Sequence, residues 1–159
     1  MTLVDRLNPL SVVKALVVFA LFTFLFHFAW EILQAPLFAN MPARHHWQAT
    51  MVCLKATFGD VEIALLCFAV AALCDQNCRW YITPNAGALA SYFGTGVLIT
   101  VAFEWYAVHK TSRWAYSDLM PIIPILKVGL APIMQWIFLP AAVLFFLQRH
   151  RAKRSSVQS

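Results

Sequence analysis

Four long apolar segments restrict the fold of this chain more than any other feature. They cover residues 15–35, 49–73, 87–108 and 128–147, and each approaches the roughly 20 residues that a helix needs to cross a bilayer. Charged residues make up only 12% of the 159, and the mean hydropathy is +0.68. A soluble domain carries about 25% charged residues. The sequence therefore predicts an all-α, polytopic integral membrane protein: a bundle of four transmembrane helices forming one domain, residues 1–159.

The distribution of Lys and Arg predicts the orientation of this bundle. One side of a four-span chain receives Arg6, Lys14 and Arg79, together with the four basic residues of the tail at residues 148–159. The opposite side receives only Arg44, Lys110 and Arg113. Because cytoplasmic loops are enriched in Lys and Arg, we expect both termini to be cytoplasmic, in a bacterial-type inner membrane. The basic tail favours contact with anionic lipid and not with nucleic acid.

The segment before the fourth span is irregular in composition. Residues 120–132 read "MPIIPILKVGLAP" and contain three prolines and a glycine. Proline lacks the N–H that a helix interior requires, so the sequence predicts a broken entry to the fourth helix.

The polar residues of the four spans gather in one half of the predicted bundle, the half nearer the outer leaflet. This placement follows because four consecutive spans cross the bilayer in alternating directions. It is the same whichever end of the bundle faces the cytoplasm. The residues are His27, Glu31 and Gln34 in the first span, Lys55, Asp60 and Glu62 in the second, Glu104 at the end of the third, and Gln135 in the fourth.

Helical phase divides these residues into faces. His27, Glu31 and Gln34 are four and seven residues apart and form one stripe. Lys55 and Glu62 share a second stripe, on which we expect an ion pair, and Asp60 points away from it. These side chains could also serve as hydrogen-bonding contacts between helices, or reach out to interfacial water.

Two of the acids are the leading candidates for chemistry. A charged side chain deep in a bilayer costs on the order of 2.5–3.5 kcal/mol, so an intramembrane carboxyl indicates a functional site. We expect Glu31 and Glu104 to lie at similar depth, to face the bundle interior and to act as acid and base, with His27 orienting or relaying. Their expected donors are His27, Lys55, His109, Arg113, Lys127 and Gln135. The expected ligand-binding residues are Trp30, Gln34, Lys55, Asp60, Glu62, Trp105, Arg113, Trp114, Tyr116 and Gln135.

A metal site is an alternative use of the same region. His27, Glu31, Glu104 and His109 offer nitrogen and oxygen ligands for one metal ion. The sequence contains no repeated His-rich box, and it indicates no other cofactor.

One segment resembles a known family. Glu104, followed by "SRWAYSDLMPIIP" at residues 112–124, is similar to the Glu…W-x-Y…P segment of lycopene-cyclase-type membrane domains. Enzymes of that family close isoprenoid rings by protonating a carbon–carbon double bond. The resemblance implies functional roles for Glu104, Trp114 and Tyr116. The chain departs from the family pattern at residues 125–127, where "ILK" stands in place of the expected acidic pair.

Three functions remain open on the sequence. The first is acid–base chemistry on, or binding of, a lipid-soluble, isoprenoid-like molecule by a membrane-embedded isomerase or cyclase. The second is a non-catalytic subunit of a larger membrane complex or homo-oligomer, because four short helices enclose little volume and commonly pack against partners. The third is a proton or ion pathway through intramembrane carboxylates.

Overall fold

The chain forms four long helices. The structure, a computed structural model, describes residues 9–157. Its long helices are α2 (Pro9–Gln34), α3 (His46–Cys74), α4 (Ala86–His109) and α5 (Leu130–Val157). Each contains a stretch long and apolar enough to cross a membrane. An unbroken apolar sequence favours a helix there because every backbone polar group is then paired within its own segment. The predicted helical bundle is confirmed, although α2 begins six residues before the first predicted span and α5 ends ten residues after the fourth.

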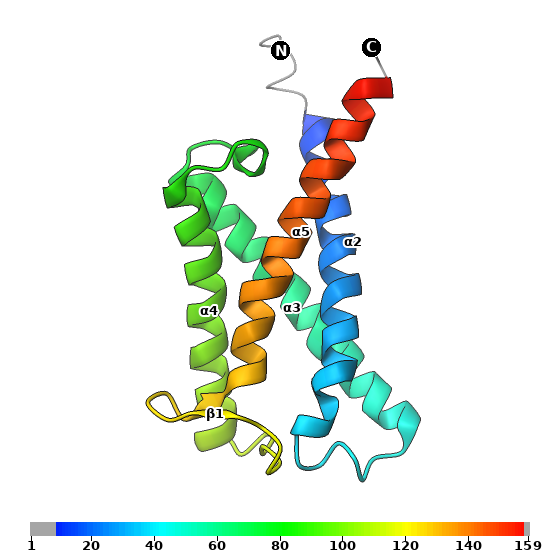
Figure 1. Ribbon diagram of the computed structural model, residues 1–159, viewed down its shortest axis with the longest axis vertical. Coiled ribbons are helices and arrows are strands. Elements are labelled where there is room, and N and C mark those ends of the chain that lie inside the picture. The colour runs from blue at the N-terminus through cyan, green and yellow to red at the C-terminus, as the bar shows by residue number, and fades with distance from the viewer. Residues whose placement is uncertain (1–8, 158–159) are drawn as a thin grey trace.

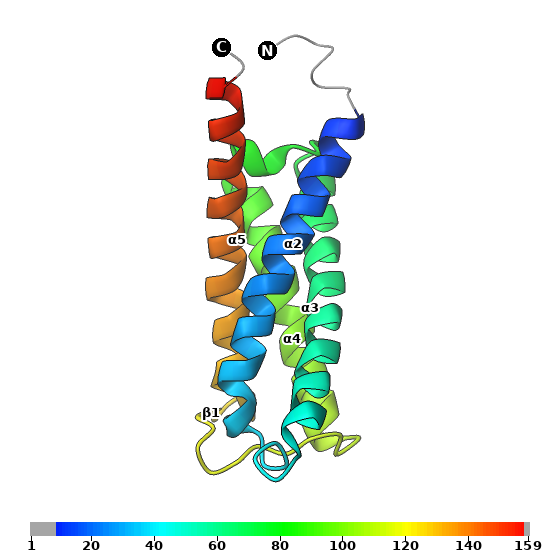
Figure 2. The ribbon, with the colours of Figure 1, turned by 90° about the vertical axis from the view of Figure 1, so that its right-hand side faces the viewer.

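The four helices form a closed ring of neighbours. α2 packs against α3 and α5, and α4 packs against the same two helices from the other side. The beginning of α2, the α3–α4 connection and the end of α5 lie at one end of the bundle (Figures 1 and 2). The two other connections lie at the opposite end, which we call the hairpin end because it carries the only strands among residues 9–157.

Residues 121–129 replace the first turns of a fourth helix with a small hairpin. Strands β1 (Ile122–Ile123) and β2 (Val128–Gly129) pair in antiparallel fashion, and Lys127 adopts a positive φ of 54° between them. Leu130 N–H donates to Pro121 O at 2.7 Å, which joins the start of α5 to the base of the hairpin. The helix therefore begins only at Leu130, and the predicted irregular entry is present.

Backbone hydrogen bonds join the two connections at the hairpin end. After α2, the chain forms the short helix η1 (Ala35–Leu37) and then runs antiparallel to residues 115–117. Ala39 N–H donates to Ala115 O, and Ser117 N–H donates to Leu37 O, both at 2.9 Å. This pairing holds the loop after α4 against the end of α2.

Aromatic side chains fill the half of the core away from the hairpin end. Phe19 of α2 lies 5.0 Å from Phe68 of α3, measured between ring centroids, and Tyr92 of α4 lies 5.1 Å from Trp80. Trp80 belongs to the short helix η2 (Trp80–Ile82), and its indole N–H donates to Phe68 O. All four rings are buried, so this half of the bundle interior is densely packed and mainly apolar.

Candidate functional site

A buried polar network joins three helices near the hairpin end. Its centre is Gln135 of α5, whose side chain is only 2% exposed. Gln135 Nε2 lies 2.9 Å from His27 Nδ1 on α2, 2.9 Å from Asp60 Oδ2 on α3 and 3.3 Å from Glu31 Oε1 on α2. His27 Nδ1 also lies 3.1 Å from Asp60 Oδ2. We call these residues, with Gln34, the amide network.

The hydrogens of Gln135 limit which of these contacts are hydrogen bonds at one time. Its amide nitrogen carries two hydrogens and accepts none, and three acceptor atoms surround it. At most two of the three contacts are therefore hydrogen bonds donated by Gln135 at once. His27 Nδ1 and Asp60 Oδ2 are also close enough to pair directly with each other.

The polar stripe of α2 is turned into the bundle, as its spacing predicted. Gln34 Nε2 donates to Glu31 Oε1 at 2.6 Å and to Gln135 Oε1 at 3.2 Å. Gln34 Oε1 accepts a hydrogen bond from Trp30 Nε1 at 3.1 Å. These bonds fix the orientation of Gln34 and leave both of its amide hydrogens paired.

A second cluster surrounds Glu104 of α4. Its carboxyl is only 7% exposed, and Oε2 accepts hydrogen bonds from Tyr116 OH at 2.5 Å and Trp114 Nε1 at 3.3 Å. No donor among residues 9–157 is bonded to Oε1. We call Glu104, Trp114 and Tyr116 the Glu104 cluster. Burial, followed by the hydrogen bond and charge of Glu104, raises the pKa of the Tyr116 phenol, so Tyr116 stays a hydrogen-bond donor.

The loop that carries Tyr116 is held in place by close backbone approach. Phe38 pairs with Tyr116 in an isolated antiparallel bridge. On the other side, a Cβ added to Gly129 of β2 would lie 3.0 Å from Tyr116 Cε1 and 2.9 Å from Met120 Sδ. The absence of a side chain at Gly129 is therefore what lets the Tyr116 ring lie beside the start of α5.

The two clusters lie at the same end of the bundle. Glu31 and Asp60 both contact Gln135 Nε2, and Glu104 lies near the end of α4. Glu31 lies three residues before the end of α2, and Glu104 lies five residues before the end of α4. At 1.5 Å per residue, their distances from the helix ends differ by only about 3 Å. Both acids therefore lie at the hairpin end, at the similar depth that their positions in the sequence predicted.

The expected donors are partly correct. Glu31 is bonded to Gln135, as expected, and also to Gln34. The expectation for Glu104 was wrong: its donors are Trp114 and Tyr116, which come from the loop after its own helix. The expected donors were charged or amide side chains, whereas the loop after α4 folds back over the carboxyl and supplies an indole and a phenol.

The predicted Lys55–Glu62 ion pair does not form. Both side chains are exposed on α3, and neither forms an ion pair with another described residue. Asp60, on a different face of α3, is the residue that enters the bundle. An ion pair between two exposed side chains contributes little free energy, and here the side chains would also have to extend across seven residues of helix.

Three further predicted residues lie outside the two clusters. Trp105 is 42% exposed and contacts His109, whose Nε2 lies 2.8 Å from Lys127 O. Arg113 is exposed and lies over the faces of Phe103 and Trp114. His109 is thus bound to the hairpin and separate from His27 and Glu31. Among residues 9–157, no group of three or more His, Cys, Asp or Glu side chains is arranged to hold a metal ion.

The sequence interpretation missed residues that shape the site without ionising. Trp136 packs edge-on against His27, with ring centroids 5.2 Å apart. A Cβ added to Gly96 of α4 would lie only 2.5 Å from Trp136 Cε3, so the glycine leaves the space that the indole ring occupies.

Thr23 and Thr100 lie one helical turn before His27 and Glu104, and their buried hydroxyls have no partner among the described residues. A threonine stands four residues before His27 and another four residues before Glu104, and this shared spacing is the sequence signal that could have placed both hydroxyls on the same faces as the ionisable groups.

No family model, curated protein or solved structure matches the chain. Its class is therefore defined by its own fold and site: a helical bundle with four helices able to span a membrane and a carboxyl-rich polar site at one end.

Proposed function

We propose that this chain is a multi-pass inner-membrane protein that performs acid–base chemistry on a lipid-soluble molecule at the hairpin end. The observation that carries this proposal is the gathering of three carboxyls between apolar helices: Glu31 and Asp60 contact the same buried amide, and Glu104 is only 7% exposed. Keeping several acids there is costly in a membrane, which favours a functional reason for their retention. The excess of Lys and Arg near the termini favours a hairpin end that faces away from the cytoplasm.

The two clusters supply the two partners that proton transfer requires. Glu104 is held through Oε2 by Tyr116 and Trp114, so Oε1 is available to a substrate. Glu31 is held through Oε1 by Gln34 and Gln135. In the proposed step, the carboxylic acid O–H of one residue breaks and a new C–H bond forms on a substrate double bond. The carboxylate of the other removes a proton from a neighbouring carbon, whose C–H electrons form the new double bond. The result is an isomerisation that needs no oxidant or reductant.

The substrate class follows from the environment and from the sequence resemblance. Glu104, Trp114 and Tyr116 carry the resemblance to lycopene-cyclase-type domains, and both Trp114 and Tyr116 donate a hydrogen bond to Glu104. Indole faces stabilise cations, and protonation of an isoprenoid double bond generates one. An isoprenoid-like hydrocarbon dissolved in the bilayer is therefore the proposed substrate.

The packing of the other half disfavours a proton or ion pathway. A pathway through one chain needs polar groups or water along the whole bundle. Away from the hairpin end, Phe19, Phe68, Trp80 and Tyr92 pack against one another in the core. Their rings separate the acids from the opposite end of the bundle.

The test compares lipid extracts of a deletion strain that carries wild-type, Glu31→Gln, Glu104→Gln or Glu62→Gln protein. Glutamine keeps the shape and one acceptor of glutamate but has no proton to transfer. We expect the same lipid-soluble compound to accumulate in the empty strain and in the Glu31 and Glu104 variants. Glu62 is exposed on α3 and is the matched control, whose extract should equal that of the wild type.

Identical extracts from the empty and wild-type strains would contradict the enzymatic proposal. Purification of the chain in mild detergent then addresses the alternative of a non-catalytic subunit. Stoichiometric co-purification of other membrane proteins, with no change in lipids, would favour that alternative.

A further inference from the structure

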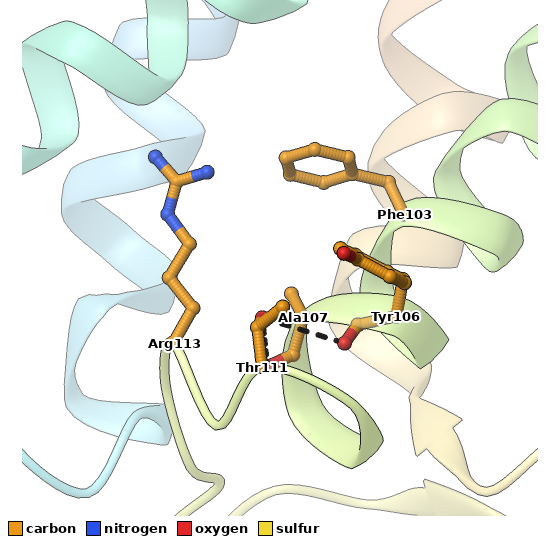
Figure 3. A pocket seen from close by; sticks show the side chains of 5 residues that line it. All are labelled: Phe103, Tyr106, Ala107, Thr111 and Arg113. Atoms are coloured by element: carbon orange, nitrogen blue, oxygen red, sulfur yellow. Dashed lines mark hydrogen bonds between the residues drawn. The ribbon is translucent and has the colours of Figure 1, made fainter.

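A groove on the outside of the bundle lies apart from the amide network. Its volume is about 290 Å³, and it is lined by Phe103, Tyr106, Ala107, Thr111 and Arg113. Figure 3 shows the Arg113 side chain as one wall, with Phe103 and Tyr106 opposite and Ala107 and Thr111 at the base. The groove is thus formed where α4 ends and its following loop turns back beside the helix.

The loop geometry that builds this groove is held by hydrogen bonds. Arg113 N–H donates to Ala107 O at 2.8 Å, and the Thr111 hydroxyl donates to the same carbonyl at 3.2 Å. Ser112, between them, has a positive φ of 48°. The chain therefore reverses direction within a few residues and places Arg113 back alongside α4.

The Arg113 guanidinium has aromatic neighbours and forms no ion pair with another described residue. It lies 5.9 Å from the centroid of Phe103 and 5.5 Å from that of Trp114. A guanidinium has five N–H donors in a fork that matches phosphate oxygens. Stacking on aromatic faces holds its plane while leaving these donors open to an anion.

The apolar part of the groove matches the other half of an amphiphile. Phe103 is 47% exposed and Tyr106 is 55% exposed on the outer surface of α4. Phe103 belongs to an apolar helix able to span a membrane, and Arg113 follows the end of that helix. The groove therefore places a cation beside exposed aromatic surface at the height where lipid head groups meet acyl chains.

We infer that this groove is a binding site for an anionic phospholipid. Its phosphodiester is held by Arg113, and the first part of an acyl chain lies against Phe103 and Tyr106. Charge complementarity selects an anionic head group over a zwitterionic one, whose own ammonium offsets the phosphate charge. The lipid would be resident beside Trp114, which also donates to Glu104, and so would occupy the surface next to the Glu104 cluster.

The experiment measures lipids that remain bound to the full chain in native mass spectrometry. The protein is purified in mild detergent and offered phosphatidylglycerol and phosphatidylcholine with identical acyl chains. Wild-type protein should prefer phosphatidylglycerol, and Arg113→Gln should reduce this preference about fivefold, the effect of one basic residue at a membrane surface. Lys110→Gln is the matched control, because Lys110 also lies over an aromatic ring, that of Trp105, at the same end of the bundle, but does not line the groove.

Phe103→Ala separates the two parts of the site. It should weaken retention of both lipids and leave the preference for the anionic head group. Arg113→Lys should keep part of that preference, because Lys retains the charge but lacks the planar fork. An unchanged preference in Arg113→Gln, or an equal loss in Lys110→Gln, would overturn the inference. Complete displacement of the lipid by inorganic phosphate would also overturn it, because the groove would then recognise the anion alone.

Discussion

Replacing Gln135 by Leu tests whether the amide network holds the bundle together. Gln135 links α5 to α2 and α3 through a single buried amide. Its two amide hydrogens allow two donated bonds at one time, and its carbonyl accepts one from Gln34. The substitution therefore removes three hydrogen bonds. Leu is close in volume, so the change leaves no large cavity.

The expected magnitude follows from this count. Side-chain hydrogen bonds between membrane helices contribute about 0.6 kcal/mol each on average, with a maximum of about 1.7 kcal/mol. Three bonds therefore correspond to about 2 kcal/mol. The carboxyl oxygens of Asp60 and Glu31 would also lose their donor, and leaving them unpaired adds to this loss. We expect Gln135→Leu to lower the free energy of unfolding by at least about 2 kcal/mol.

The assay is reversible unfolding of the purified protein by SDS in mild detergent, followed by tryptophan fluorescence. The control is Gln148→Leu, because Gln148 lies on the same helix and makes one hydrogen bond, from Nε2 to Tyr81 O at 2.8 Å. Its loss should be about 0.6 kcal/mol. Equal losses for the two variants would refute the reasoning, since they would mean that the number of hydrogen bonds at Gln135 does not govern stability.

Two further predictions concern the residues that shape the site. Gly96→Ala should destabilise the protein by about 1–3 kcal/mol, because the new Cβ would overlap Trp136; Gly94→Ala, with no atom within 4 Å of its added Cβ, should be neutral or gain up to about 1 kcal/mol in the same unfolding assay. Burial and Glu104 raise the pKa of Tyr116, so Glu104→Gln should lower that pKa toward its ordinary value while burial keeps it above about 10. The measurement is the ultraviolet absorbance of tyrosinate against pH, with Tyr116→Phe subtracted, and an unchanged titration in Glu104→Gln would show that Glu104 does not act on Tyr116.

The sequence alone determined the number and position of the helices. Each long apolar segment became one helix, because in apolar surroundings a segment of this composition pairs its backbone groups within itself. Alternating crossings then placed His27, Glu31, Glu104 and Gln135 at one end before any packing was known. The prolines at residues 121–132 likewise indicated an irregular entry to the fourth helix, which begins at Leu130.

The tertiary structure decided which polar faces of the helices became interior. The periodicity of α3 separated Asp60 from Lys55 and Glu62 but did not say which face meets the neighbouring helices. Asp60 is interior because that side of α3 faces His27 and Gln135. Helical phase is a local property, whereas the rotation of a helix about its axis is set by contacts with all of its neighbours.

The partners of Glu104 were decided in the same way. Trp114 and Tyr116 lie in a loop, whose course no periodicity describes. Pairing of that loop with residues 37–39, and the close approach that Gly129 permits, bring both donors to one carboxyl oxygen. These contacts join residues that are far apart in the chain, and they form only once α2, α4 and the hairpin are in place.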